Sequence, residues 1–140
     1  MFENIIDKEK NKFYNIPENV ISEVEEKLDI VFPIELLEFY KEIGYGFLDS
    51  ERGNFNRIMD PESICEFRFR EGQFNNDSEL EIYEEDEKDK IIFFEICEGI
   101  YLSIGFSEDN NGKIFYGQNM IAGSLKEFLI KYQENEQYYM

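Results

Sequence analysis

The chain has 140 residues, and 14 basic against 32 acidic side chains give it a formal net charge of −18 at pH 7. This length suits one domain, and a hydrophobic content of 42% is enough for a core that needs no disulfide or metal support. The charge argues against nucleic acids and anionic membranes as partners, since both attract basic proteins, and it favours a basic protein partner.

Two helices are predicted in the first third of the chain. Residues 15–28 carry apolar side chains at every third or fourth position, and Asn15 with Glu18 resembles a capping box. After a short break, Pro33 opens a second helix, which ends at the glycines of residues 44–46. Because the connection is short, we expect the two helices to lie antiparallel.

The middle of the chain is less regular. Residues 54–59 suit a short strand, and Asp60 before Pro61 is typical of the start of a short helix. Residues 72–89 are polar and rich in acids. We expect them to form a loop or a weakly ordered segment around one short strand at residues 80–83.

The clearest strands lie in the second half. Residues 90–97 are apolar at nearly every position, as in a strand covered on both faces, and residues 100–106 alternate. The polar residues 107–112 predict a turn into a third strand at 113–116. Ser124 and Glu127 form a capping box for a final helix.

These elements predict an α+β fold in one domain. Strands joined by tight turns must pair antiparallel, because parallel pairing needs a long crossover. We therefore expect an antiparallel-rich sheet with the N-terminal helix pair and the C-terminal helix packed on one face of it. The domain would span residues 1–140, with residues 1–14 as an N-terminal extension and residues 133–140 as a frayed tail.

The residue types present argue against catalysis. The chain has no histidine, which removes the usual general base at neutral pH and the commonest metal ligand. Cys65 and Cys97 lie among apolar neighbours without CxxC spacing, so we expect both to be reduced core residues. No secretory signal or long apolar run occurs, so we expect a cytoplasmic protein. No cofactor is predicted.

The sequence supports none of three familiar kinds of site: a calcium loop, a phosphate-binding loop and a glycosidase carboxylate pair. The stretch before Gly112 resembles a calcium loop, but the sixth residue after this glycine is Gln118 where the loop needs a glutamate. The glycines form no phosphate-binding motif. With 32 acidic residues, neighbouring carboxylates arise without selection for catalysis, so no glycosidase pair is assigned.

A partner-binding surface remains as the candidate. The acids between residues 79 and 89 would present carboxylates to a basic partner, with a merely solvated charge run as the alternative. Two aromatic residues near glycines are candidates for exposed anchors, with a place in the core as the alternative. The candidate partner-binding residues are Tyr45, Phe47, Asp49, Glu51, Glu84, Glu85, Asp86 and Glu87.

The order of the motifs along the chain resembles that of a known protein family. Residues 21–40 read I-x-x-V-E-x-x-L-x-I-x-F-P-x-E-L-x-x-F-Y, and the closing stretch 113–129 contains Ala122, Ser124, Leu125, Phe128 and Leu129 at matching positions. Both stretches are similar to the first helix pair and the last strand and helix of the SUKH superfamily. The resemblance spans residues 15–132, although the chain has no tryptophan and its acid-rich middle has no counterpart in the family pattern.

The resemblance implies a protein-binding function without catalysis. Many bacterial members of the superfamily are immunity proteins that neutralise a toxin, often a nuclease, encoded beside them, and fungal members regulate cell-wall assembly through protein contacts. We expect an immunity-type binding protein that docks an acidic surface on a cognate nuclease toxin and is not an enzyme. The alternatives are a regulatory or scaffolding module with a different partner, and an enzyme that uses carboxylates and a metal ion.

Overall fold

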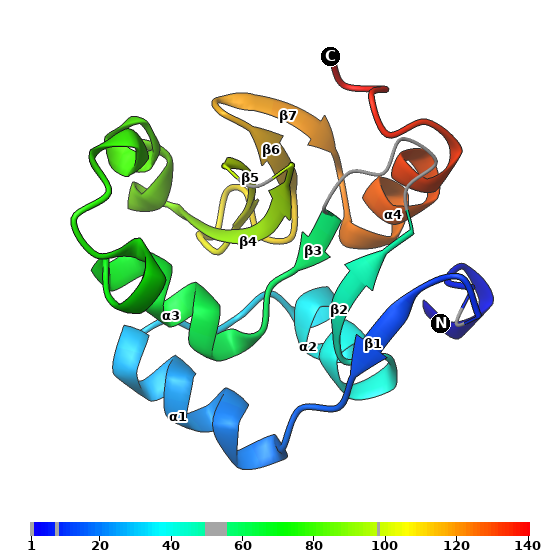
Figure 1. Ribbon diagram of the computed structural model, residues 1–140, viewed down its shortest axis with the longest axis horizontal. Coiled ribbons are helices and arrows are strands. Elements are labelled where there is room, and N and C mark those ends of the chain that lie inside the picture. The colour runs from blue at the N-terminus through cyan, green and yellow to red at the C-terminus, as the bar shows by residue number, and fades with distance from the viewer. Residues whose placement is uncertain (1, 8, 50–55, 98) are drawn as a thin grey trace.

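An antiparallel sheet runs through the computed structural model, which describes residues 2–7, 9–49, 56–97 and 99–140. Within these residues the sheet has seven strands, and their order in space equals their order in the chain, so each strand pairs with the next (Figure 1). The expected antiparallel pairing is confirmed. The strands are β1 (Lys12–Tyr14), β2 (Tyr45–Leu48), β3 (Asn56–Ile58), β4 (Lys90–Ile96), β5 (Ile100–Gly105), β6 (Ile114–Tyr116) and β7 (Asn119–Ala122).

The predicted helices are confirmed, and the fold is a single α+β domain. Asp60 caps the third helix by accepting a hydrogen bond from the Ser63 backbone, and Ser124 caps the last helix in the same way. The capping box predicted at Asn15 does not form, because Pro17 occupies the N-cap position of the first helix. The α-helices are α1 (Glu18–Leu28), α2 (Ile34–Glu42), α3 (Pro61–Phe69) and α4 (Leu125–Glu134), and the 3₁₀ helices are η1 (Phe2–Asn4), η2 (Gly72–Phe74), η3 (Ser78–Tyr83) and η4 (Asp86–Lys88).

The break between α1 and α2 is held by the residues that carry the sequence motif. Glu25 accepts a hydrogen bond from the Phe32 backbone nitrogen at 2.8 Å, which fixes the chain where it leaves α1. The Phe32 ring is buried and packs against Tyr40, whose hydroxyl donates to the Met59 carbonyl at 2.6 Å. The motif therefore serves the fold.

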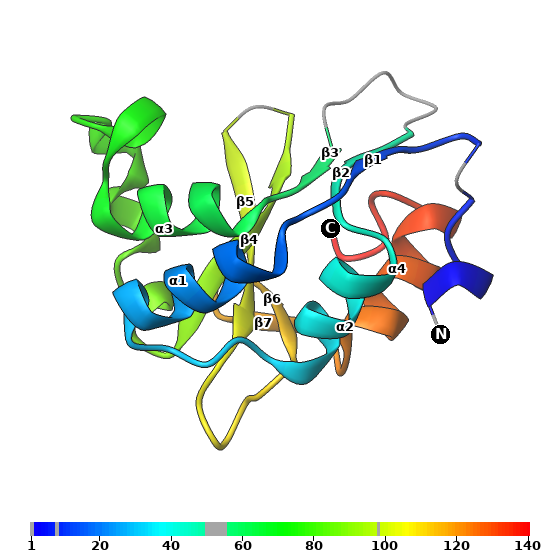
Figure 2. The same ribbon diagram turned by 90° about the horizontal axis from the view of Figure 1, so that it is seen from below.

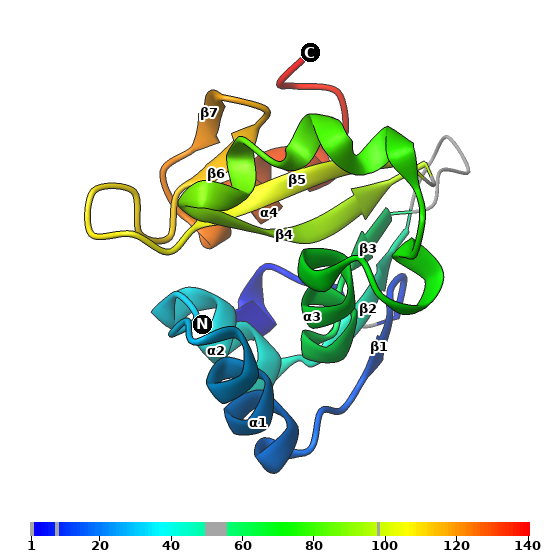
Figure 3. The same cartoon turned by 90° about the vertical axis from the view of Figure 1, so that its left-hand side faces the viewer.

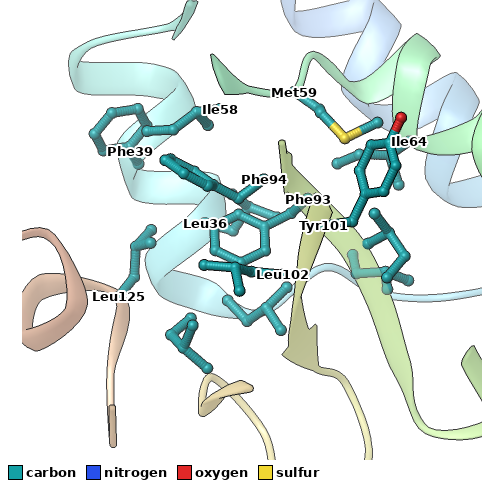
Figure 4. Packing of buried hydrophobic residues seen from close by; sticks show 14 of the residues in the cluster. Leu36, Phe39, Ile58, Met59, Ile64, Phe93, Phe94, Tyr101, Leu102 and Leu125 are labelled. Carbon is teal, nitrogen blue, oxygen red and sulfur yellow. The ribbon is translucent and has the colours of Figure 1, made fainter. Parts of the chain in front are cut away.

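One face of the central strands packs against α4. The buried ring of Phe94 on β4 lies 5.3 Å from the Phe128 ring and 5.2 Å from the Tyr132 ring, centroid to centroid. Helix α2 also contributes to this layer, and Figure 4 shows Leu36 and Phe39 of that helix close to Phe93 and Phe94. This layer belongs to the single apolar core of the described residues.

The opposite face of β4 and β5 is covered as well, so the expectation that helices cover only one face is wrong. Tyr101 on β5 packs edge to face against Phe67 of α3, Phe74 of η2 and Tyr83 of η3. Figure 3 shows α4 behind the sheet and the segment after α3 in front of it. The connection between β3 and β4 is long enough to lay α3 and three 3₁₀ helices across the sheet.

Three short strands, β1, β2 and β7, are among the elements that the sequence did not predict. The stretch around Gly46 was interpreted as the end of a helix and a turn, but it forms β2. Gly46 has a φ of +149°, and a Cβ there would lie 2.1 Å from the Lys12 carbonyl oxygen on β1, so glycine allows the two strands to approach. Residues 80–83, expected to be a strand, belong to the 3₁₀ helix η3.

The C-terminal residues expected to fray are packed in the structure. The Tyr138 hydroxyl donates a hydrogen bond to the Ile121 carbonyl at 2.8 Å, and the Tyr139 ring lies 5.2 Å from the Tyr116 ring. These two contacts tie residues after α4 back to β6 and β7. Among the described residues, none of the helices has both the length and the apolar character that a membrane crossing requires.

Candidate functional site

In the acid-rich segment between α3 and β4, some carboxylates face solvent and others face the protein interior. Asp77, Glu79, Glu81, Glu84 and Glu85 are exposed, whereas Asp86 and Glu87 turn toward the protein. We call the exposed group, together with Ile82, the acidic ridge. The segment is therefore an ordered element with one charged side, in contrast to the expected loop.

Ile82 is the apolar member of the acidic ridge. Its side chain is 74% exposed and lies near the end of η3, between Glu81 and Glu84 along the chain. An isoleucine this exposed contributes little to the core, and apolar side chains inside a polar rim are typical of protein-binding surfaces. The sequence did not reveal it, because the strand expected at 80–83 left open which side faces solvent.

Apolar anchors hold the acidic ridge against the sheet. Leu80 and Tyr83 on η3 are buried, and the Tyr83 ring packs against Phe67 of α3 at 5.8 Å. The Tyr83 hydroxyl also accepts a hydrogen bond from the Tyr101 backbone nitrogen at 3.0 Å. The exposed acids of η3 therefore belong to an element whose other side is part of the core.

An ion pair ties the segment that carries the acidic ridge to the end of α3. The guanidinium of Arg70 donates to both carboxylate oxygens of Glu87, at 2.5 and 3.2 Å, and also to the carbonyl oxygens of Phe67 and Leu80. The Arg70 and Glu87 side chains are only 25% and 11% exposed. Burial raises the pKa of Glu87, and the hydrogen bond from Arg70 opposes that shift. Glu87, a predicted partner-binding residue, is therefore engaged within the fold.

Asp86 is also turned inward. It is 5% exposed and accepts a hydrogen bond from the Gln118 side chain, which follows β6. Burial raises the pKa of Asp86 above its ordinary value of 3.8, although Lys90 favours the charged form. Of the four acids predicted at residues 84–87, the structure leaves Glu84 and Glu85 facing outward.

The raised pKa of Asp86 predicts a pH-dependent effect of Asp86→Asn. A carboxyl with a folded pKa above its unfolded value destabilises the fold at neutral pH, and this cost disappears once pH falls below the unfolded value. We expect the variant to exceed the wild type in free energy of unfolding by up to about 1 kcal/mol at pH 7. The difference should shrink toward pH 4, as measured by urea titration at both pH values. A variant less stable at pH 7 would contradict this.

The other predicted residues lie on or near β2. Tyr45 and Phe47 are half-buried on the face of β2 that lies away from the buried Leu48, and the Tyr45 ring lies 5.5 Å from the ring of Tyr14 on β1. Asp49 is exposed at the end of the strand, and Glu51 lies outside the described residues. Figures 1 and 2 both place β2 far from the segment of the acidic ridge. The predicted residues therefore form two separate groups.

Metal-binding and nucleophilic groups are the other candidates for a functional site. Within the described residues, no group of three or more histidine, cysteine or acidic side chains is placed to hold a metal ion. Cys65 is buried, which raises its thiol pKa, and both cysteines are free. Cys97 is exposed, so its predicted place in the core is wrong; it lies in the turn after β4 with a φ of +51°. Residues 107–112 form the predicted turn, in which Asn110 accepts hydrogen bonds from Ser107.

Comparisons with known proteins relate the chain to proteins of known role. The family model of the SMI1/KNR4 family (SUKH-1) matches residues 15–131. A protein of Bacillus subtilis (strain 168) named immunity protein YxxD is 45% identical over 131 residues, which cover 94% of this chain and 89% of the relative. No solved structure matches the chain with significance.

Proposed function

Because the chain belongs to the SMI1/KNR4 family (SUKH-1), we propose that it is an immunity protein that binds a toxin encoded beside it and blocks the toxin's active site. The observation that carries this proposal is the 45% identity to an immunity protein over nearly the whole of both chains. The proposed role is binding without catalysis, and the partner is a basic protein in the same cytoplasm.

The acidic ridge is our candidate for the toxin-binding surface. Its five exposed carboxylates lie close to the exposed Ile82 in the sequence, and apolar anchors hold the element in place. Binding energy in protein interfaces is concentrated in a few well-packed side chains, while charged rims steer encounter and exclude wrong partners. We propose that Ile82 fills an apolar hollow on the toxin while the surrounding acids meet basic side chains.

The acidity of the ridge favours a nuclease as the toxin. Nucleases present basic surfaces to the phosphates of their substrates, and a protein with a net charge of −18 is attracted to such a surface. A ridge of carboxylates would occupy the place of the phosphate backbone and so exclude the substrate. Association should then be fast at low ionic strength and weaken as salt is added.

Charge reversal of the ridge tests this proposal. Changing Glu79, Glu81, Glu84 and Glu85 to lysine is expected to weaken binding of the adjacent gene's product about ten- to hundredfold at 0.15 M salt, since rim charges contribute modestly each. The same changes should reduce rescue of cells that express this product. Binding is measured by calorimetry and rescue by colony counts.

A matched control separates the ridge from net charge. The control changes four other acids to lysine, all of them exposed and outside the ridge: Glu18, Glu23, Glu26 and Glu108. Both variants then have the same net charge, −18 + 8 = −10. We expect this variant to keep most of the affinity and the rescue. Equal losses in both variants would mean that the ridge is not the docking surface. An adjacent gene product that the wild-type protein neither binds nor neutralises would contradict the immunity function itself.

A further inference from the structure

A polar pocket lies at the side of the molecule away from the acidic ridge. It is bounded by the segment before β1, the end of β2 and the end of α4, and it has a volume of about 320 Å³. Figures 1 and 2 both show these elements at the end of the molecule opposite the segment after α3. This volume is at the lower end of the range for small-ligand pockets. The polar lining that matters here is Asp7, Asn11, Asp49, Glu134, Asn135 and Glu136.

Two buried amides, one in the lining and one behind it, hold residues that line this pocket. The side chain of Asn11, 9% exposed, donates to the Asp7 carbonyl at 2.7 Å and accepts from the Asp49 backbone nitrogen at 2.6 Å. Asn56, 1% exposed, accepts from the Tyr132 hydroxyl and donates to the Glu136 carboxylate at 2.8 Å. The pocket is therefore formed before any ligand arrives, which lowers the entropy cost of binding.

The charges of the described lining residues favour a cationic ligand. Among the described residues, four carboxylates line it against one lysine, Lys10, and none of the four forms an ion pair with another described residue. The partly buried carboxylates of Glu87 and Glu95 elsewhere are each paired with an arginine. A concave site lined by one sign of charge concentrates its field and attracts counter-ions.

We propose that this pocket binds the guanidinium group of an arginine side chain presented by a protein. Guanidinium carries five donors in a planar arrangement, and the residues that line the pocket include the acceptor carboxylates of Asp49, Glu134 and Glu136. The inference goes beyond the proposed function, because this pocket is remote from the ridge and would give the protein a second, independent contact with a basic chain.

The test uses methylguanidinium as the probe and the full chain as the protein. Chemical-shift changes at the side-chain amides of Asn11, Asn56 and Asn135 are expected to saturate in the millimolar range. The double variant Asp49→Asn/Glu136→Gln should weaken this binding at least fivefold, whereas the ridge variant Glu84→Gln/Glu85→Gln should bind like the wild type. Shifts that grow linearly without saturation, or an equal loss in both variants, would overturn the proposal.

A second probe identifies the source of the cation. N-acetylarginine amide, which carries the side chain on a peptide-like backbone, is expected to perturb the same amides with similar affinity. Binding of methylguanidinium without binding of the larger probe would contradict an arginine on a protein and assign the pocket to a free small cation. Because neither probe is a toxin, failure here leaves the proposed function standing, and failure of the toxin experiment leaves this result standing.

Discussion

Replacing Phe94 by alanine is expected to lower the free energy of unfolding by about 3–5 kcal/mol. The ring is fully buried at the centre of β4 and packs against Phe93, Phe128 and Tyr132. Removing it leaves a cavity between the sheet and α4 that rigid neighbours on both sides cannot fill, and it also removes the edge-to-face ring contacts. A loss of this size is about a fifth or more of the stability of a typical domain, which is about 5–15 kcal/mol.

Urea denaturation measures the effect, with Phe69→Ala as a matched control. Phe69 is also a phenylalanine but is 44% exposed at the end of α3, so its truncation should cost less than about 1 kcal/mol. For the Phe94→Ala variant, the urea concentration at the unfolding midpoint should fall strongly, while the dependence of the free energy of unfolding on urea concentration should not change. If that variant does not fold, Phe94→Leu, which retains most of the volume, should fold with a smaller loss. Equal midpoints for the Phe94 and Phe69 alanine variants would contradict this packing.

The helices were predictable because their signals lie close together in the sequence. Asp60 caps the backbone of Ser63, and Ser124 caps that of Glu127, so each cap can be recognised within four residues. The strand β2 could not be recognised in this way. Its partners on β1 and β3 are set by pairs such as Lys12 with Phe47, and its glycine is explained only by the neighbouring strand. Local patterns do not contain this information.

The acidic character of the candidate site was predictable, but the direction of its side chains was not. Glu84 and Glu85 face solvent while the next two acids turn inward, and nothing in the local pattern separates them. The difference comes from partners distant in the chain, Gln118 for Asp86 and Arg70 for Glu87. The exposure of Ile82 depends in the same way on the anchors of η3, which only the folded chain shows.

Removing the Arg70 side chain is expected to have the second-largest effect on stability. Arg70→Ala would leave the Glu87 carboxylate, 11% exposed, without the cation that it pairs with directly, although Arg68 still acts on it electrostatically, and would also remove hydrogen bonds to two carbonyl oxygens. Breaking a largely buried pair by removing one partner is costly because the remaining charge stays desolvated. We expect a loss of about 2–4 kcal/mol in the free energy of unfolding, measured by urea titration at pH 7.

Two further variants isolate the cause of that loss. Lys88→Ala breaks an ion pair with Glu85 in which both side chains are about 70% exposed, and should cost less than about 0.5 kcal/mol. The double variant Arg70→Met/Glu87→Met removes both charges and fills their space with apolar atoms, so it should be more stable than Arg70→Ala alone. If the double variant is instead the less stable of the two, the pair itself stabilises the fold. The loss in Arg70→Ala would then not arise from a stranded carboxylate.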